Sequence, residues 1–531
     1  MSAEPRTPGA HPLEWAWLAI GLILVWRYFF LLDDAFVYFR TVDNLLFLRL
    51  GLVYNAGEYV EGFSSPLWTL LLIPLRASGL GWSDLVLLLA LASYALFWAL
   101  AVRVNRALSP PGAPLSLPTA GLGLLYAVPT WFSSGLESPL VHLSAAGYAL
   151  FALFPAARSW QLLVGLSPLV RHELLVPFGL AFAWAWRRTG RPPVFLGLAM
   201  GLPLGAWLGF RVLYFADLFP NTFYLKDLAD WGQGLAYLRD TARPYHLGAL
   251  AAALLTLALA LSARGGEARL ALRGALLLFA LPVALYVVRI GGAPIHYRYL
   301  AFPVCLLFFA GAGLPEQALR RFAPRAPRAT APVLGAAVAA FFLSLYPPQL
   351  GRNPWLGPAR GDSVGKITDA AYHRWRIGDG ESTTQGIDPA SLRALRESQP
   401  RFAYRGVYVT RWCADGYRAL DQRVIIAYGL TDAVLARVET PPGRPAHKPR
   451  LPGMAQDLAR IAERAEASGE GLGPGLFRRA VLAGEAPPWV AEQLATLEVL
   501  ERKIFNRHRP LENLGLALRF LPRIAPPERG R

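Results

Sequence analysis

Long apolar runs recur along the first two thirds of the chain. Each is close to the length of about 20 residues that crosses the hydrocarbon core of a bilayer. One or two such runs could form a signal sequence or an anchor, whereas a larger number predicts a polytopic membrane protein. The runs occupy residues 13–32, 85–102, 194–213, 247–261, 270–288, 299–314 and 331–346.

The pattern changes from about Pro347 onwards, where charged residues, glycine and proline replace the apolar runs. We therefore predict a transmembrane domain over 1–346 and a soluble domain over 347–531. Within the second domain, the apolar patterning is typical of strands at 401–412 and 423–430 and of helices at 455–467 and 489–505. The expected fold is a membrane-embedded all-α bundle with a C-terminal α/β domain.

The formal net charge of +17 would suggest a nucleic-acid partner in a soluble protein. Here many of the basic residues lie in short loops between apolar runs, at 187–191, 263–273 and 320–328. Basic loops of this kind are typical of the cytoplasmic side of a membrane protein. The charge therefore predicts a membrane orientation, and we expect the bilayer as a partner and no nucleic acid.

These loops lead to a count of about eleven spans, with the N-terminus in the cytoplasm. Because residues 1–14 are too polar and proline-rich for a cleaved signal, we expect the run 13–32 to remain as the first span. Asp33 and the C-terminal domain then lie outside the cytoplasm. The same count leaves Arg103 and Arg106 on the outer side, against the charge rule.

Two adjacent aspartates, Asp33 and Asp34, follow the first run directly. A helix cap needs one aspartate, and a second one adds repulsion that raises the pKa of at least one of them. A raised carboxyl pKa suits a general base or a cation-binding group. Neighbouring side chains on a helix point about 100° apart, so we expect the two residues to have distinct roles.

A second polar group, Arg171, His172 and Glu173, interrupts an apolar stretch. Charges inside a membrane normally face a polar cavity and pair with one another. Two interpretations stay open, since Arg171 and Glu173 could neutralise each other as part of the scaffold or could contact substrate. His172 has no companion at metal-ligand spacing, which favours a packing role.

Further polar residues follow on the predicted outer side. Asn221 stands at a turn just after a span, and Tyr224 and Lys226 come next. Lys226 could extend to the membrane surface or bind a phosphate. His296 and Arg298 follow a Gly-Gly turn. Two arginines, a lysine and paired aspartates on one face predict an anionic, lipid-linked substrate.

Several motifs resemble those of one superfamily, the polytopic GT-C glycosyltransferases. Within it, the chain is most similar to the terminal β-arabinofuranosyltransferase of mycobacterial cell-wall arabinan and its bacterial relatives. The motifs are DDAFVYFRTVDNLL from residue 33, SSGLESPL at 133–140, LVRHELLV at 169–176, ADLFPNTFYLK at 216–226, YRYLAFP at 297–303 and YGLTD at 428–432.

The resemblance implies a GT-C-type bundle in a bacterial inner membrane. It also implies transfer of a sugar, such as arabinofuranose, from a polyprenyl-phosphate donor to an extracytoplasmic cell-envelope glycan. The essential aspartate of the first external loop would be Asp33 or Asp34, and Arg171, Lys226 and Arg298 would hold the donor phosphate. The predicted substrate-binding residues are Arg40, Glu61, Arg171, Glu173, Asn221, Tyr224, Lys226, His296 and Arg298.

The mechanism stays open at this level. In an inverting reaction one aspartate would be a general base, and its neighbour would orient the acceptor or hold a divalent metal ion. In a retaining reaction an aspartate could be the nucleophile. The chain has His172 where relatives commonly have proline, and Ala293 where many have an acidic residue, which leaves the donor sugar open.

Two other functions compete with this prediction. A transporter or flippase of a lipid-linked sugar would favour broken helices in two repeated halves, and the sequence shows no such repeat. A non-catalytic envelope assembly factor would need the membrane domain and the soluble domain but no reactive carboxylates. Sugar transfer with Asp33 and Asp34 substituted separately distinguishes these functions.

Overall fold

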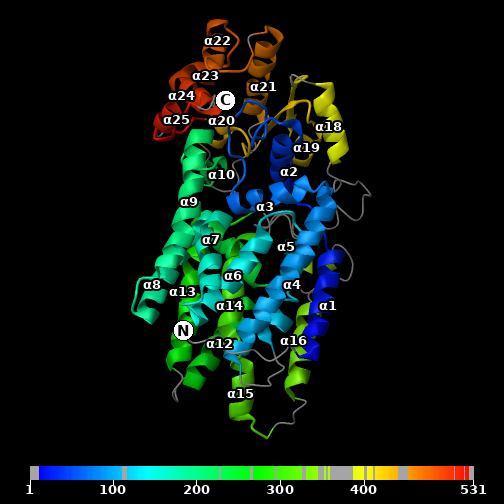
Figure 1. The fold of residues 1–531 in the computed structure, drawn as a ribbon, viewed down its shortest axis with the longest axis vertical. Coiled ribbons are helices and arrows are strands. Elements are labelled where there is room, and N and C mark those ends of the chain that lie inside the picture. The colour runs from blue at the N-terminus through cyan, green and yellow to red at the C-terminus, as the bar shows by residue number, and fades with distance from the viewer. Residues whose placement is uncertain are drawn as a thin grey trace. The chain divides into compact units, whose positions relative to one another are not determined.

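The structure is a computed structural model, drawn as a ribbon in Figure 1. It describes residues 11–109, 116–226, 229–262, 267–293, 296–325, 330–344, 352–353, 357–358, 387–399, 403–410, 413–427, 429–439, 452–469, 471–506, 509–519 and 521–525.

Two compact units divide the chain, and each is built from separate segments. Unit 1 contains residues 1–31, 86–203 and 230–382, and unit 2 contains residues 32–85, 204–229 and 383–531. The division falls inside helices α4 (Trp82–Leu108) and α9 (Val194–Phe215). The units therefore do not follow a single boundary at Pro347, and the assignment of 1–346 and 347–531 to different environments stays a prediction.

Unit 1 consists mainly of apolar helices. Its centre is formed by α13, which packs against α14 and α8, and by α6, which packs against α14 and α7. Besides parts of α4 and α9, the elements are α1 (Pro12–Arg27), η2 (Leu117–Leu122), α5 (Ala127–Phe132), α6 (Ser138–Leu153), α7 (Arg158–Val170), η3 (His172–Leu174), α8 (Leu175–Thr189), α11 (Trp231–Ala242), α12 (Leu247–Ser262), α13 (Glu267–Arg289), η4 (Arg298–Leu300), α14 (Ala301–Gly311), α15 (Leu314–Phe322), α16 (Thr330–Ser344), β1 (Arg352–Asn353) and β2 (Gly357–Pro358).

Small residues allow these helices to approach closely, as membrane helices often do. A Cβ atom on Gly165 of α7 would lie 2.7 Å from the Cβ atom of Ala199 on α9. A Cβ atom on Gly147 of α6 would lie 2.4 Å from a methyl carbon of Leu163 on α7. A larger side chain at either glycine would therefore force the two helices apart.

Several helices are suited to cross a membrane by length and composition. Among the residues that the structure describes, four qualify alone, at Trp82–Leu108, Val194–Phe215, Arg269–Arg289 and Arg298–Phe322. A bent pair, Trp231–Ala242 with Leu247–Leu261, makes a fifth if it is one span. The prediction of a mostly helical membrane protein is thereby confirmed, while the count of about eleven spans, the orientation and the identity of the membrane stay predictions.

One ion pair bears on the predicted topology. Arg106, near the end of α4, forms a 2.5 Å ion pair with Glu14, near the start of α1. Arg106 therefore lies at the same end of unit 1 as the start of α1, and Arg103, one turn earlier in α4, lies at that end too, while the side of the membrane on which they lie stays a prediction. The intervening helix α3 (Pro66–Ala77) has 12 residues and extends about 18 Å. It is too short to cross a core of about 30 Å and so adds no crossing between α1 and α4.

Unit 2 combines the first long loop with the C-terminal part of the chain. Its two strands pair in parallel, with Val407 opposite Arg423. Besides parts of α4 and α9, the elements are α2 (Ala35–Asp43), η1 (Asn44–Leu48), α3, α10 (Asn221–Tyr224), α18 (Pro389–Ser398), β3 (Val407–Thr410), α19 (Cys413–Arg418), β4 (Arg423–Ile426), α20 (Ala433–Ala436), α21 (Pro452–Ala467), α22 (Leu476–Leu482), α23 (Pro488–Glu492), α24 (Leu494–Ile504) and α25 (Pro510–Ala517).

The C-terminal elements lie where the patterning predicted them. The strands β3 and β4 fall inside 401–412 and 423–430, and α21 and α24 cover most of the two predicted helices. Helix α21 buries Met454, Leu458, Ile461 and Ala465 in the core of this region. Their spacing of four, three and four residues places them on one face, which explains why the sequence folds as a helix here.

Candidate active site

Asp33 is held by the C-terminal part of the chain. Its two carboxylate oxygens accept hydrogen bonds from the backbone amides of Cys413 and Ala414, at 2.9 Å each. These residues open helix α19, and the amides at the start of a helix favour a negative charge. The first loop and α19 are therefore joined at the predicted catalytic carboxylate.

The environment of Asp33 moves its titration toward neutral pH. Burial raises the pKa of Asp33 from 3.8 to about 6, and the carboxylate of Asp34 adds to the rise. The hydrogen bonds from Cys413 and Ala414 act in the opposite direction, because they favour the ionised form. A carboxyl group that titrates in this range is suited to proton transfer.

Asp34 has a different environment from its neighbour. It is the N-cap residue of α2, with backbone angles φ −58° and ψ −23°, and its side chain makes no capping hydrogen bond. Its side chain is half-buried. The two aspartates therefore differ in their contacts, in keeping with the distinct directions that their spacing predicts.

Asp33, Asp34 and Cys413 lie close enough to face one cation. A carboxylate oxygen from each aspartate and the Cys413 sulfur lie within 4.8 Å of one another. Burial, with the two carboxylates nearby, raises the pKa of the Cys413 thiol, and a protonated thiol is a poor metal ligand. Hard cations prefer about six oxygen ligands. The donor set as a whole fits such a metal poorly, so the chemistry proposed below uses none.

Arg40 holds the other end of α19. Its guanidinium donates hydrogen bonds to the carbonyl oxygens of Tyr54 at 2.8 Å, Ala419 at 3.0 Å, Gln422 at 2.9 Å and Gly416. The side chain is buried, with 1% of its surface exposed. The guanidinium of Arg40, which we predicted to contact substrate, thus donates to backbone carbonyl oxygens. These hydrogen bonds fix α19 against the first loop.

Asp43 forms a buried polar centre that the sequence did not reveal. It accepts hydrogen bonds from Arg76 Nε at 2.8 Å, Trp82 Nε1 at 2.9 Å and the Tyr417 hydroxyl at 2.7 Å. Both Asp43 and Arg76 have no exposed side-chain surface. This network gives α19 another attachment to the first loop, and its only sequence sign is a charge inside an apolar helix.

Glu61 and Asn221 lie together, and both are engaged within the protein. The Asn221 amide donates to the Glu61 carbonyl oxygen at 2.9 Å. Arg211 binds the Glu61 carboxylate at 2.5 and 3.1 Å. The Asn221 side chain donates to the carbonyl oxygens of Gly429 at 2.8 Å and Leu430 at 3.0 Å. Asn221 therefore anchors the GLTD turn to α10.

Tyr224 belongs to a neighbouring charged cluster. Its hydroxyl donates to Asp217 at 2.6 Å, and the guanidinium of Arg437 lies 3.7 Å from the centre of its ring. Arg437 in turn forms a 2.5 Å ion pair with Asp217. Lys226 lies just beyond α10 and is half-buried. Of these predicted contacts, Tyr224 thus has an internal role, while the phosphate contact at Lys226 stays a prediction.

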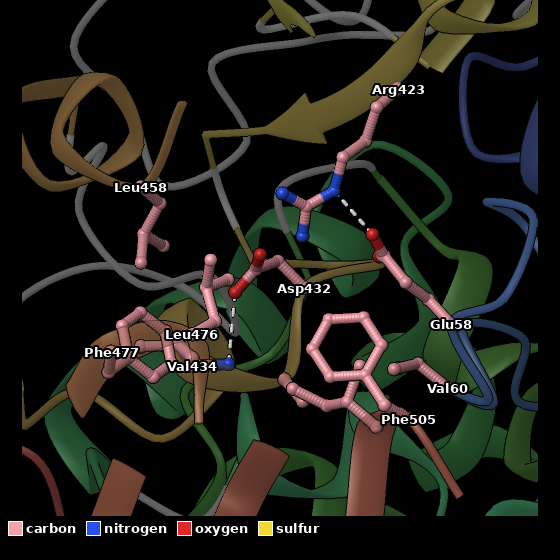
Figure 2. Close-up of a pocket in the computed structure, with 11 residues that line it drawn as sticks. Glu58, Val60, Arg423, Asp432, Val434, Leu458, Leu476, Phe477 and Phe505 are labelled. Carbon is pink, nitrogen blue, oxygen red and sulfur yellow. Dashed lines mark hydrogen bonds and ion pairs between the residues drawn. The ribbon is translucent and has the colours of Figure 1, made fainter. Parts of the chain in front are cut away.

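Figure 2 shows a pocket of unit 2 with charged groups beside an apolar wall. Arg423 donates to the Glu58 carboxylate, and Asp432 accepts from the Val434 amide at 2.9 Å. These groups bind one another or the backbone, and no predicted catalytic or substrate-binding residue lines the pocket. We therefore assign no catalytic role to it. The apolar residues labelled there are Val60, Val434, Leu458, Leu476, Phe477 and Phe505.

In unit 1, Arg171 lies between two carboxylates. Its Nη1 atom is 2.7 Å from Glu137 Oε1, and its Nε atom donates to Glu173. The guanidinium also lies 4.6 Å from the centre of the Tyr299 ring. The internal pairing of Arg171 with Glu173 is therefore present. The second partner, Glu137, was not predicted as a site residue, although it stands in the SSGLESPL motif.

Arg298 joins the same cluster. Its Nη2 atom lies 3.6 Å from Glu137 Oε1, and its guanidinium lies 5.5 Å from the Tyr299 ring. The structure thus brings Arg171 and Arg298 together on one carboxylate, as their predicted common role requires. The formal charges of two arginines and two glutamates cancel. A phosphate at this cluster would compete with the carboxylates for the arginine donors.

The two histidines have separate partners. His172 Nε2 lies 3.2 Å from the Tyr286 hydroxyl, which is consistent with packing. His296 Nε2 lies 3.1 Å from the Tyr245 hydroxyl, and its Nδ1 lies 3.4 Å from Asp240 Oδ2. Within the described residues, neither histidine belongs to a group of three or more metal-ligating side chains.

Comparison with known proteins finds similarity to enzymes of one name. The chain is 31% identical over 269 residues to the terminal beta-(1->2)-arabinofuranosyltransferase of Mycobacterium tuberculosis, covering 44% of this chain and 42% of that protein. It is 30% identical over 352 residues to the protein of the same name from Corynebacterium glutamicum, covering 56% of this chain and 49% of that protein. The chain resembles terminal arabinofuranosyltransferases.

The predicted resemblance is thereby confirmed on independent grounds. No protein-family model and no solved structure matches the chain. The chain spans about half the length of the curated relatives it matches. Their activity and substrates therefore come to this chain only as a proposal.

Proposed function

We propose that the chain is a GT-C-type membrane glycosyltransferase. It moves a sugar of the arabinofuranose class from a polyprenyl-phosphate donor to a cell-envelope glycan outside the cytoplasm. The observation that carries the proposal is the identity of 31% and 30% with two arabinofuranosyltransferases. The candidate membrane spans support it, because a lipid-linked donor is held in the bilayer. The carboxylate pair of Asp33 and Asp34 supports it, because an acceptor hydroxyl needs a group that takes its proton.

Asp34 is the residue that we assign to the acceptor. The acceptor oxygen attacks the anomeric carbon, its proton passes to the Asp34 carboxylate, and the bond from sugar to phosphate breaks. The polyprenyl phosphate leaves with the electron pair of that bond. Asp33 is held by α19 and acts as a positioning residue for its neighbour. If the product retains the donor configuration, the same carboxylate instead attacks the anomeric carbon and the polyprenyl phosphate leaves; the acceptor oxygen then displaces the carboxylate from that carbon, and the acceptor proton passes to the released phosphate.

The arginines of unit 1 are the proposed donor contacts. Arg171 and Arg298 would bind the donor phosphate by exchanging Glu137 for a phosphate oxygen, which retains a charge-assisted hydrogen bond. This exchange lets the cluster remain neutral when empty and become a binding site when the lipid arrives. Lys226 remains a further proposed phosphate contact.

The test measures sugar transfer by the purified full chain in nanodiscs. A radiolabelled polyprenyl-phosphate arabinofuranose and an arabinan oligosaccharide serve as donor and acceptor. We expect Asp34→Asn to abolish transfer and Asp33→Asn to reduce it strongly. The control is Glu485→Gln, at an exposed carboxylate between α22 and α23, and this variant should retain transfer. Full activity of both aspartate variants contradicts the catalytic assignment. Movement of the donor across the bilayer without a new glycosidic bond supports a flippase instead.

A further inference from the structure

Helix α25 lies against the end of a candidate membrane span. The Asn513 side chain donates a hydrogen bond of 2.6 Å to the carbonyl oxygen of Leu213, in the last turn of α9. Figure 1 shows the two elements side by side. Helix α9 has 22 residues and extends about 33 Å, so its end lies near the edge of a core of about 30 Å. The contact therefore holds α25 at the level of the membrane surface.

One face of α25 is apolar and exposed. Asn513, Leu516 and Ala517 are buried, with 1%, 5% and 3% of their surface exposed. On the opposite face Leu511, Leu514 and Leu518 are 87%, 45% and 59% exposed. Their spacing of three and four residues places them in one stripe along the helix. Scattered exposed leucines are common, whereas a continuous exposed stripe indicates a surface that is covered by a partner.

The end of the candidate span also carries exposed apolar side chains. Leu213 on α9 is 46% exposed and Phe219, just beyond α9, is 37% exposed. Basic residues stand on either side of the stripe, Arg509 before α25 and Arg519 after it, and both are exposed; Arg509 also forms a 3.2 Å ion pair with Glu512, which a head-group phosphate would share. Long basic side chains beside an apolar face are typical of helices that lie in a membrane surface, where they reach lipid phosphates.

We propose that α25 is an interfacial helix that docks the C-terminal part of unit 2 onto the bilayer. Leu511, Leu514 and Leu518 enter the boundary between head groups and acyl chains, and Arg509 and Arg519 bind the head-group phosphates. The lipid is favoured over a protein partner because α25 is hydrogen-bonded to the last turn of a candidate membrane span and because basic residues flank its apolar stripe. The proposal holds whichever sugar the chain transfers.

The test uses the full chain in nanodiscs of phosphatidylcholine and phosphatidylglycerol. Single variants Leu511→Cys, Leu514→Cys and Leu518→Cys carry a nitroxide spin label, and Leu482→Cys is the matched control. Leu482 is 81% exposed on α22 of the same unit. The native Cys305 and Cys413 are buried and should not react with the label.

We expect the three labels on α25 to collide more with oxygen and less with an aqueous nickel chelate than the control label does. Interfacial helices bury their apolar face by about 5–10 Å, so the labels should lie about that far below the phosphates. Nickel accessibility equal to that of Leu482→Cys overturns the proposal. Spin–spin broadening at these positions also overturns it, since the stripe would then pair two copies of the chain.

The arginines supply a second measurement, which tests the head-group contact by changing Arg509 and Arg519 while the label position stays the same. In nanodiscs rich in phosphatidylglycerol, the double variant Arg509→Gln and Arg519→Gln should shift a Leu514→Cys label toward the aqueous phase. The same double variant should leave the Leu482→Cys label unchanged. An unchanged Leu514→Cys label contradicts the assigned contact with lipid phosphates.

Discussion

The Asp33 pair of unit 2 and the Arg171 cluster of unit 1 arrange buried charge in opposite ways. Asp33 and Asp34 are adjacent like charges, and Asp33 accepts hydrogen bonds from two backbone amides of α19. Arg171 forms ion pairs with Glu137 and Glu173, and Arg298 lies 3.6 Å from Glu137. The first arrangement raises the pKa of a carboxyl group, and the second places each positive charge beside a negative one.

The difference separates two kinds of site. A pair of like charges is costly to hold together, so its retention favours a reactive role. A neutral cluster of opposite charges is stable by itself and can serve as scaffold or as a site that opens for an anion. The comparison therefore supports the proposal that the chemistry lies at the pair of Asp33 and Asp34 and the donor contact at Arg171 and Arg298.

The largest predicted effect follows from removing the carboxylate that the two arginines share. Glu137→Gln leaves an uncompensated positive charge among buried groups, and we expect the free energy of unfolding to fall by about 3–5 kcal/mol. Unfolding in mixed micelles measures the change. Glu173→Gln is the matched control and should cost less, because Glu137 still faces both arginines. Equal losses in the two variants show that the cluster is not centred on Glu137.

The next effect is a pH dependence that belongs to Asp33. Because its pKa is raised from 3.8 to about 6, the folded chain binds this proton more tightly than the unfolded chain. Its protonation therefore stabilises the fold as the pH falls from about 6 to about 4, by at most about 3 kcal/mol.

Transfer activity should move the opposite way over the same pH range if Asp33 must be ionised to position Asp34. Unfolding and transfer are measured for the wild-type chain and for Asp33→Asn, and the difference isolates this group. A wild-type stability curve that runs parallel to that of Asp33→Asn between pH 6 and 4 shows that Asp33 keeps its ordinary pKa.

A smaller effect tests the amides that hold Asp33. Proline is favoured at the first position of a helix and has no N–H, so Cys413→Pro deletes one donor while keeping α19. A hydrogen bond to a charged group contributes about 1.5–3 kcal/mol, and we expect that loss relative to Cys413→Ala, which retains the amide. Thermal unfolding measures it. The pKa of Asp33 should also rise further in the proline variant, and identical behaviour of the two variants rules out the amide contact.

The smallest effect concerns His172 at the edge of the Arg171 cluster. Its side chain is 38% exposed, and its hydrogen bond to Tyr286 is the contact to remove. His172→Phe and Tyr286→Phe should each lower the free energy of unfolding by about 0.5–1.5 kcal/mol. Because they remove the same bond, the double variant should cost less than the sum of the two. Additive losses show that the bond does not form.

The helices could be predicted from sequence because their signal is local. The runs 194–213 and 270–288 match α9 and α13 within a few residues, since apolar length is set by the bilayer and needs no distant partner. The pairing of Arg171 with Glu173 is equally local. Glu137 was missed as their partner because it lies 34 residues away from Arg171 in sequence.

The contacts that define the Asp33 site could not be predicted in the same way. Its hydrogen-bond donors are backbone amides 380 and 381 residues further along the chain, and an amide is present at nearly every residue. Arg40 and Asn221 were predicted as substrate contacts because polar residues in a motif suggest a ligand. In the structure both side chains donate to backbone carbonyl oxygens. A polar residue in a motif looks the same in sequence whether it binds a ligand or the backbone.

The discontinuous make-up of unit 2 has a consequence during synthesis. Asp43 and its partner Tyr417 are 374 residues apart, and a ribosome adds about 5–20 residues per second. The first loop therefore remains without α19 for about 20–75 s while the intervening helices are made and inserted. During that time Arg40, Asp43 and Arg76 remain hydrated, and the aromatic residues around them are open to chaperones and proteases. The environment of Asp33 is completed only when α19 has been made, because its amide donors belong to Cys413 and Ala414.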